Sequence, residues 1–344
     1  MSKKQHIAVI RLSAMGDVAM TVPVLRALVL QHPEITVTVV SRPFFKPFFD
    51  GIPNVSFFAV DLNKRHKGLP GLLRLYSDLR ELKVDAVADL HNVLRSKVVR
   101  NLFMLSGKKV AATDKGRADK KALTRFKDKI FSPVKPMVER HADTFEQLGF
   151  KIDLSHPQFP PKSVLSDEIV SVIGNRDKKW VGIAPFAQYE SKVYPVDLMQ
   201  QLIDGLAKEA NLNVLLFGGG EKEIQLLTKL KGNHSNVTVL AGKLKFKQEL
   251  EVISNLDLML SMDSGNAHIA AMLGVKVITL WGATHPYSGF KPFNQPDDFC
   301  LTSDREKYPL LPTSVYGNKK VEGYEDAMRS ISPETVLAKI KKEL

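Results

Sequence analysis

Two carboxylates in this sequence follow apolar runs and stand at the start of candidate helices. Asp17 follows HIAVIRL, residues 6–12, with Gly16 beside it, and Asp263 follows LDLMLSM, residues 256–262. Ligands of parallel sheets bind beyond the carboxyl ends of the strands, so a carboxylate there can accept a proton or contact a ligand. Either residue could instead only stabilise the first turn of a helix, where the helix dipole favours negative charge.

The residues around the second carboxylate have the composition of an anion site. Ser264, Gly265 and His268 come directly after Asp263, in a segment of small residues that reads as a helix start. Free N–H groups and the positive end of the helix dipole attract phosphate, and a glycine lets phosphate approach closely. The pattern predicts a diphosphate site. The alternative is that Asp263 or Ser264 only caps the helix and that His268 is a hydrogen-bonded interior histidine.

Two further loops carry residues suited to a nucleotide. Lys192 follows the strand-like residues 178–185 and precedes an amphipathic helix, where its ammonium can reach a phosphate. Gly219 and Gly220 end another strand-like run before Glu221, whose carboxylate could bind ribose hydroxyls. The alternatives are that Lys192 is an ordinary exposed lysine and that Glu221 only stabilises the start of a helix. With the anion site, these residues predict that the second half of the chain binds a nucleotide diphosphate.

Strand-like and helix-like periodicities alternate along the whole chain. This pattern predicts an α/β protein with two Rossmann-like, doubly wound parallel-sheet domains in tandem. The 344 residues, 44% of them hydrophobic, suffice for two cores. The proline-marked residues 154–164 read as a linker, so we expect an N-terminal domain of residues 1–160 and a C-terminal domain of residues 161–344. Packing of the final helix back on the N-terminal domain is an open option.

The first domain differs from a nucleotide-binding domain in its opening turn. It has no G-x-G-x-x-G, only Gly16, so it is poorly suited to hold a pyrophosphate. In a cleft between the domains, Asp17 would face the bound nucleotide, where the helix start favours its ionised form and it could accept a proton from a hydroxyl. Lys192 and the helix start at 263–268 would stabilise a diphosphate leaving group. No metal is expected, because no D-x-D pair or ligand cluster is present.

The excess positive charge of the chain lies in its first half. Residues 1–160 carry 27 lysines and arginines against 15 acidic residues, whereas residues 161–344 carry 22 of each. The densest run, residues 108–136, reads as a mobile, solvated segment. Anionic lipid or a phosphorylated substrate at a membrane surface would suit it, and a merely solvated basic face is the alternative. Nucleic acid is not expected, because no nucleic-acid-binding motif accompanies the run.

The cysteine count and the apolar runs indicate a cytoplasmic protein. The single cysteine, Cys300, excludes an intrachain disulfide and an all-cysteine metal site, as is typical of a reducing compartment. No apolar run approaches the roughly 18 residues that a membrane span requires, and the first residues lack the layout of a signal peptide. We therefore expect a cytoplasmic location, with peripheral attachment to the inner face of the inner membrane as an option.

Five motifs together resemble glycosyltransferase family 9, the ADP-heptose:lipopolysaccharide heptosyltransferases. They occur in the family's order over essentially the whole chain, and the element D-[ST]-G-x-x-H is the most specific. The motifs are RLSAMGD (11–17), DLHNVLRSK (89–97), SKVYP (191–195), FGGGEKE (217–223) and SMDSGNAHIAAMLGVKVITLWGATHP (261–286). The resemblance implies a GT-B fold, with two domains facing a cleft, and inverting transfer of heptose from ADP-heptose to the inner core of lipopolysaccharide.

The resemblance also implies roles for individual residues. Asp17 would be the general base, Lys192 would contact the donor diphosphate, and Glu221 would bind the ribose. The remaining donor contacts would be Gly219, Gly220, Asp263, Ser264, Gly265 and His268, with adenine against residues 240–246. The candidate acceptor contacts are Ser13, Arg95 and Ser96, and a structural salt bridge is the alternative for Arg95. No cofactor is implied besides the donor substrate.

Three departures from the family pattern limit what the resemblance implies. His91 and Asn92 stand in place of Gln-Gly, His285 replaces the aspartate of G-x-T-D-P, and Ala327-Met328 replaces Cys-Met. These leave open the donor sugar, the acceptor hydroxyl and the oligomeric state. The competing functions are transfer of another nucleotide-sugar on the same fold, a nicotinamide-dependent oxidoreductase, and a nucleotide- or lipid-binding protein without catalysis. The missing G-x-G-x-x-G opposes the oxidoreductase, and the retained Asp17 opposes the non-catalytic protein.

Overall fold

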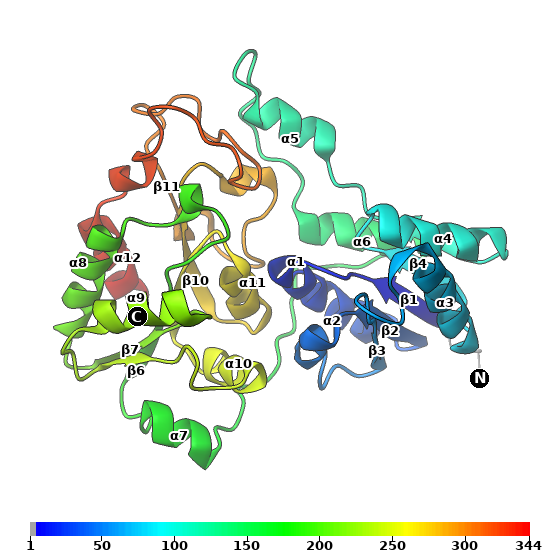
Figure 1. The fold of residues 1–344 in the computed structure, drawn as a ribbon, viewed down its shortest axis with the longest axis horizontal. Coiled ribbons are helices and arrows are strands. Elements are labelled where there is room, and N and C mark those ends of the chain that lie inside the picture. The colour runs from blue at the N-terminus through cyan, green and yellow to red at the C-terminus, as the bar shows by residue number, and fades with distance from the viewer. Residues whose placement is uncertain (1–4) are drawn as a thin grey trace. The chain divides into compact units, whose positions relative to one another are not determined.

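The computed structural model describes residues 5–344, which form two compact units (Figure 1). The first unit contains the chain up to Arg117 and then Lys135–Gln158, and the second contains Ala118–Val134 and Phe159–Leu344. The chain therefore enters the second unit twice. Residues 118–134, which we expected in the N-terminal domain, belong to the second unit.

The first unit is built on a five-stranded sheet in which all strand pairs are parallel. The strand order is β3-β2-β1-β4-β5, with β1 at the centre between β2 and β4. Residues 7–10 of β1 are at most 1% exposed, which explains why this strand reads as a continuous apolar run. The strands are β1 (Gln5–Ile10), β2 (Ile35–Ser41), β3 (Val55–Ala59), β4 (Ala86–Asp89) and β5 (Lys109–Ala112).

Helices cover both faces of this sheet. On one face, α3 and α4 bury Leu75, Leu79 and Phe103 against the strands, and on the other face α2 packs against α6. Met20 separates α1 from α2, as the C-cap of the first helix and the N-cap of the second. The helices are α1 (Met15–Ala19), α2 (Thr21–Gln31), α3 (Gly68–Glu81), α4 (Leu94–Leu105) and α6 (Met137–Leu148), with a short 3-10 helix η1 (Pro43–Phe48).

The second unit holds a six-stranded parallel sheet. Its order is β11-β10-β9-β6-β7-β8, so that β6 and β9 are neighbours at its middle. Its core includes Ile183, Leu260 and Ile278, all fully buried. The strands are β6 (Lys179–Ala184), β7 (Leu212–Leu216), β8 (Val237–Val239), β9 (Leu258–Met262), β10 (Lys276–Trp281) and β11 (Cys300–Thr302).

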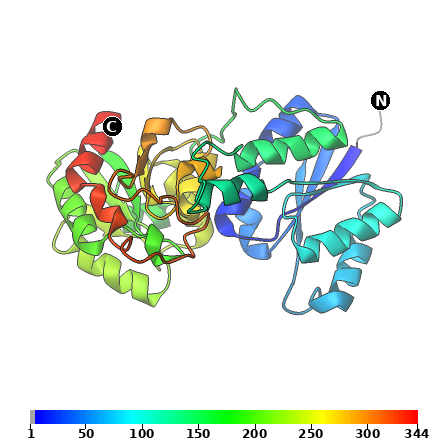
Figure 2. The ribbon, with the colours of Figure 1, turned by 90° about the horizontal axis from the view of Figure 1, so that it is seen from above.

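The last helix, α12, belongs to the second unit and packs against α8 (Figure 2). Gly205 of α8 makes room for it, because a Cβ at this position would lie 2.7 Å from Leu337. The helices are α7 (Asp167–Ile173), α8 (Val196–Ala207), α9 (Glu221–Lys231), α10 (Phe246–Ser254), α11 (Gly265–Met272) and α12 (Pro333–Glu343). The 3-10 helices are η2 (Glu190–Lys192), η3 (Pro286–Ser288), η4 (Asp297–Phe299) and η5 (Ala327–Ser330).

Part of the basic segment 108–136, including Lys120, is not solvated as its composition predicted. It contains strand β5 and helix α5 (Arg117–Thr124). Lys120 is 4% exposed, with its ammonium 4.1 Å from the centre of the Phe290 ring. The prediction was wrong because a lysine can bury its aliphatic stem where its ammonium finds a partner, and composition does not reveal that partner.

Each sheet reverses its direction of growth beside a central strand pair, β1 with β4 and β6 with β9. The loops after such a pair run to opposite faces and leave a crevice where ligands of open α/β sheets bind. Asp17 and His91 follow the first pair, and Lys192 and Asp263 follow the second. Within residues 5–344, none of the helices combines the length and apolar content that a bilayer crossing requires.

Candidate active site

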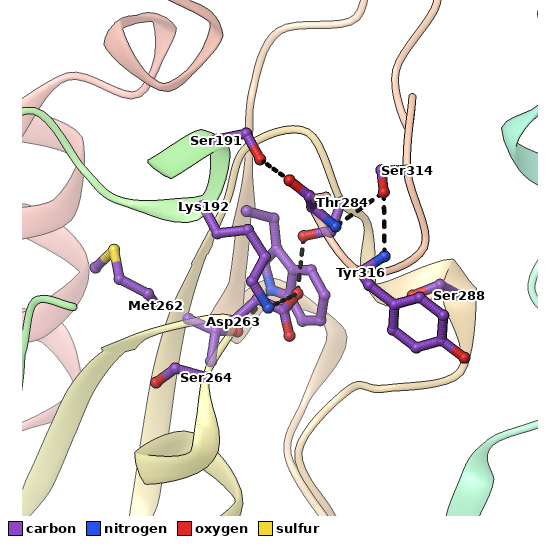
Figure 3. Close-up of polar contacts among 12 residues, drawn as sticks. Ser191, Lys192, Met262, Asp263, Ser264, Thr284, Ser288, Ser314 and Tyr316 are labelled. Carbon is purple, nitrogen blue, oxygen red and sulfur yellow. Dashed lines mark hydrogen bonds and ion pairs between the residues drawn. The ribbon is translucent and has the colours of Figure 1, made fainter. Parts of the chain in front are cut away.

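Lys192 and Asp263 meet at the crevice of the second sheet (Figure 3). The Lys192 Nζ lies 3.1 Å from Asp263 Oδ2, although the residues are 71 positions apart in the chain. Thr284 Oγ1 donates to the same carboxylate oxygen at 2.9 Å. The Lys192 and Asp263 side chains are only 12% and 10% exposed, so the ion pair is largely shielded from water. Two residues predicted to bind a diphosphate are therefore adjacent.

A loop that sequence reasoning missed, residues 313–317, holds Lys192 in place. Ser191 Oγ donates to the Gly317 carbonyl at 2.6 Å, and the Gly317 N–H donates to Ser314 Oγ at 2.9 Å (Figure 3). Gly317 has a φ of +83°, and a Cβ there would lie 2.6 Å from Cγ of Lys192. The lysine stem thus packs where only a glycine leaves room. The one signal in the sequence was an isolated glycine in a loop.

The start of helix α11 lacks a side-chain cap. Ser264 occupies the N-cap position, but its hydroxyl lies 3.1 Å from Ser261 Oγ and accepts no bond from the helix. The Asp263 carboxylate is engaged by Lys192 and Thr284, so the capping alternative does not describe these residues. Gly265 is the first helical residue and His268 is 7% exposed within the same helix. A helix start of this kind presents N–H donors and a positive dipole end to an anion.

The glycine loop before α9 is closed by a residue that was not predicted. The N–H of Gly219 donates to Glu223 Oε2 at 2.8 Å, and Gly220 takes a φ of +80° as the N-cap of α9. Glu221 is the first residue of the helix and is exposed. Among the described residues, no side-chain partner of Glu221 is found, which leaves its carboxylate open to a ligand.

In the first unit, Asp17 is held by an arginine. The Arg11 Nη2 lies 2.7 Å from Asp17 Oδ1, and the Ala14 N–H donates to Asp17 Oδ2 at 3.2 Å. Arg11 is 4% exposed and also donates from Nη1 to the Leu90 carbonyl at 2.6 Å, which ties the loop after β1 to the loop after β4. The half-buried Ser13 precedes the helix start. The Asp17 side chain is 30% exposed, so solvent reaches it.

The loop after β4 is organised by Asp89, a buried carboxylate that was not predicted. Asp89 Oδ1 accepts from the N–H groups of His91 and Asn92 at 3.1 and 2.7 Å, and Arg100 Nη1 lies 3.2 Å from its Oδ2. The imidazole Nδ1 of His91 accepts from the Leu12 N–H at 3.4 Å. Burial, together with the charges of Arg11 and Lys115, lowers the pKa of His91 to about 3. His91 is therefore neutral at physiological pH.

The two remaining acceptor candidates lie on helix α4. Ser96 is 1% exposed, and its hydroxyl accepts from the Val93 N–H at 3.0 Å, so it serves the helix start. Arg95 is exposed, and the described residues 5–344 include no ion-pair partner for it. The structural salt bridge considered for Arg95 is thus not formed.

Comparison with known proteins decides the family. The sequence profile of glycosyltransferase family 9 (heptosyltransferase) matches residues 72–318. The chain belongs to glycosyltransferase family 9. It is similar to the lipopolysaccharide core heptosyltransferase OpsX of Haemophilus influenzae, at 24% identity over 352 residues that cover 98% of this chain and 96% of the relative. This protein is therefore a glycosyltransferase enzyme.

Solved structures of family 9 share its fold. The glycosyl transferase family 9 protein of Veillonella parvula superposes with a TM-score of 0.76 at 19% identity, covering 100% of this chain and 98% of that one. The E. coli heptosyltransferase WaaC with ADP gives 0.68 at 18% identity, covering 99% and 100%. The two Rossmann-like units of this family 9 enzyme are therefore those of the GT-B fold.

Two of the departures from the family 9 pattern have a physical explanation. Asn92 has a φ of +45°, in the left-handed region that suits the glycine otherwise expected there, and asparagine tolerates that region better than most residues. His285 lies 5.0 Å from Phe131 between ring centres, and its Nδ1 accepts from the Tyr287 N–H. Burial and the charge of Arg305 lower the pKa of His285 to about 4. The histidine thus packs with segment 118–134.

Metal ligands are not gathered at this site. Within residues 5–344, no group of three or more His, Cys, Asp or Glu side chains could hold a metal ion. Burial raises the pKa of the Cys300 thiol. The charged groups described above are Lys192, Asp263 and Glu221 in the second unit and, separately, Arg11 and Asp17 in the first.

We predict that Lys192→Met destabilises the enzyme more than the double variant Lys192→Met/Asp263→Asn. The single change leaves a nearly buried carboxylate without its ammonium, at a cost of about 2–3 kcal/mol, and the second change removes that charge. Chemical denaturation measures both free energies of unfolding. Equal destabilisation of the two variants would contradict the prediction that the unpaired carboxylate causes the loss of stability.

Proposed function

We propose that this enzyme transfers heptose from ADP-heptose to the inner core of lipopolysaccharide, with inversion at the sugar carbon. The observation that carries the proposal is the contact of Lys192 with Asp263 beside the uncapped start of α11, because this combination suits a diphosphate. The similarity to lipopolysaccharide heptosyltransferases supports the sugar and the acceptor.

In the proposed donor complex, the diphosphate replaces Asp263 as the partner of Lys192. The Asp263 carboxylate keeps the hydrogen bond from Thr284 and becomes available to sugar hydroxyls. The N–H groups at Ser264 and Gly265 face the phosphates, and His268 lines the sugar side. Glu221 binds the ribose beside Gly219 and Gly220, and the adenine lies against residues 240–246. The structural similarity to WaaC, which was solved with ADP, supports a donor of this class.

Asp17 is the proposed general base. It takes the proton of an acceptor hydroxyl while that oxygen bonds to the anomeric carbon and the bond from this carbon to the ADP oxygen breaks. Arg11 holds Oδ1 and the Ala14 N–H holds Oδ2, so the carboxylate is oriented before substrate arrives. The negative charge that develops on ADP is stabilised by Lys192 and the α11 start. These groups perform the transfer without a metal ion.

The proposed acceptor is anionic and anchored in a membrane. Arg11, Arg42 and Lys115 place positive charge around His91, close to the loops that hold Asp17. Ser13 and Arg95 are the proposed contacts on the first unit. The protein would act from the cytoplasm, attached peripherally to the inner face of the inner membrane, and nucleic acid is not a partner. The positive charge in the first half supports an acceptor that carries negative groups.

We expect the product of ADP-heptose and a truncated core acceptor to gain the mass of one heptose. Thermal stability should rise with ADP and stay unchanged with NAD. The start of α11 suits a diphosphate, but the sequence has no G-x-G-x-x-G loop for a dinucleotide. Mass spectrometry and a thermal-shift series measure the two results. Stabilisation by NAD alone would favour an oxidoreductase and refute the proposal.

Asp17→Asn should lower the turnover number by at least about 10³-fold, since an amide cannot accept the acceptor proton. The affinity for ADP should stay within about twofold, because Asp17 is proposed to act on the acceptor hydroxyl and not on ADP. Steady-state kinetics and calorimetric titration measure the two. Asp50→Asn, an exposed carboxylate of the same unit, is the control and should keep full turnover. A turnover number that Asp17→Asn leaves unchanged would refute the assignment.

Gly317→Ala should weaken ADP binding at least about tenfold, because the new Cβ displaces the Lys192 stem from the phosphates. Gly323→Ala is a matched control, since Gly323 also has a positive φ, +78°, but nothing lies within 4 Å of its added Cβ. Both variants bear a similar backbone cost, and calorimetric titration compares their ADP affinities. Equal affinities would show that Lys192 does not bind the diphosphate.

A further inference from the structure

The loop that follows α5 spans residues 125–130 (Figure 1). Two of its large apolar side chains are exposed to solvent. Phe126 and Ile130 are each 53% exposed. The exposed cations Lys121, Arg125 and Lys127 lie beside them in sequence. We call residues 121–130 the basic tip. It combines apolar and positively charged groups over a few residues of the second unit.

Hydrogen bonds give the basic tip a defined shape. The Ile130 N–H donates to the Ala122 carbonyl at 3.1 Å, and Arg125 Nε donates to the Asp128 carbonyl at 2.6 Å. Asp128 takes a φ of +51°, which turns the chain back. Leu123 is fully buried beneath the turn. The outward placement of Phe126 and Ile130 is thus a consequence of the fold of this loop.

The base of the basic tip is tied to the second unit by a half-buried ammonium. Lys129 Nζ donates to the carbonyl oxygens of Leu123, Leu310 and Pro312 at 3.2, 2.6 and 2.7 Å. On the far side, the guanidinium of Arg305 stacks 3.3 Å from the centre of the Phe131 ring. These contacts fix the base of the tip to the second unit.

Phe131 also connects the basic tip to the loop that carries Thr284. Its ring packs against His285 and Tyr287, and the Val134 N–H donates to the Tyr287 carbonyl at 2.8 Å. Thr284 in turn donates to Asp263. The position of the tip is thus linked, through packed side chains, to the candidate diphosphate site of the same unit.

We propose that the basic tip docks this enzyme on an anionic lipid bilayer. Phe126 and Ile130 would enter the interface between headgroups and acyl chains, while Lys121, Arg125 and Lys127 pair with lipid phosphates. Two apolar side chains are far fewer than a stable protein interface of about 1,000 Å² requires, whereas shallow insertion needs only a few. This step rests on the proposed function, in which the acceptor is lipid-anchored.

A flotation assay with the full chain tests the proposal. We expect binding to phosphatidylcholine vesicles that contain about one-third phosphatidylglycerol, and weak binding to phosphatidylcholine alone. Lys121→Gln/Lys127→Gln should weaken binding about fivefold for each charge removed. Phe126→Ser/Ile130→Ser should weaken it about tenfold or more. Full binding by both double variants would overturn the proposal.

Two control variants separate the basic tip from other surfaces. Lys208→Gln/Lys229→Gln removes two exposed cations elsewhere on the second unit and should leave binding unchanged. Leu69→Ser/Leu94→Ser removes side chains 62% and 78% exposed on α3 and α4, the strongest rival apolar face. Loss of binding in the rival variant with retention in the tip variants would place the membrane contact on the first unit and refute the proposal.

Fluorescence provides a direct reading of insertion. The native Trp180 and Trp281 are at most 1% exposed, so they should not respond to lipid. Phe126→Trp should show a blue shift of emission with anionic vesicles and quenching by lipids brominated near the headgroup. An unshifted emission while the protein is bound to vesicles would show that the tip stays outside the bilayer.

The test also separates this proposal from the transfer reaction itself. With a truncated, water-soluble acceptor, the tip variants should turn over like the parent enzyme, since no residue changed lies among those that bind substrate. With acceptor embedded in vesicles, their rates should fall in step with vesicle binding. A parent enzyme that binds vesicles but transfers no heptose would refute the proposed function alone.

Discussion

The side-by-side pairing of β6 and β9 is the constraint on which the candidate site depends. The chain builds the second sheet outward from β6, then crosses back to place β9 on its other side. The loops after these two strands therefore meet at one edge, and Lys192 contacts Asp263 across 71 residues of sequence. The ammonium, the carboxylate and the start of α11 lie together because a parallel sheet orders its carboxyl ends at a single edge.

A cation and a carboxylate are paired in the first unit as well, again with the cation earlier in the chain. There β1 and β4 are neighbours, and Arg11 at the end of β1 holds both Asp17 and the Leu90 carbonyl. In each unit a carboxylate is paired with a cation at the reversal of strand order. Pairing limits the cost of leaving charged groups in shielded positions. Both sites are thus arranged before a ligand arrives.

Segment 118–134 shows how one stretch of chain can serve both stability and surface chemistry. Lys120 and Lys129 face inward, to Phe290 and to three carbonyls, while Lys121 and Lys127 face solvent. Phe131 packs against His285, which stands at a position where the family pattern has an aspartate. His285, which departs from the family motif, and segment 118–134 therefore form one packed contact, because the histidine provides the ring that Phe131 covers.

The sequence by itself determined the fold class, the family and most of the motif residues, because buried parallel strands read as apolar runs and the loops after them carry distinctive polar residues. It did not determine which cations face inward: Lys120 and Lys129 look like Lys121 and Lys127 until their partners are known. Only the tertiary structure showed that Ser96 serves a helix start, that Glu223 closes the glycine loop, and that Gly317 makes room for Lys192. These contacts join residues far apart in the chain or depend on backbone angles, so spacing alone carries no sign of them.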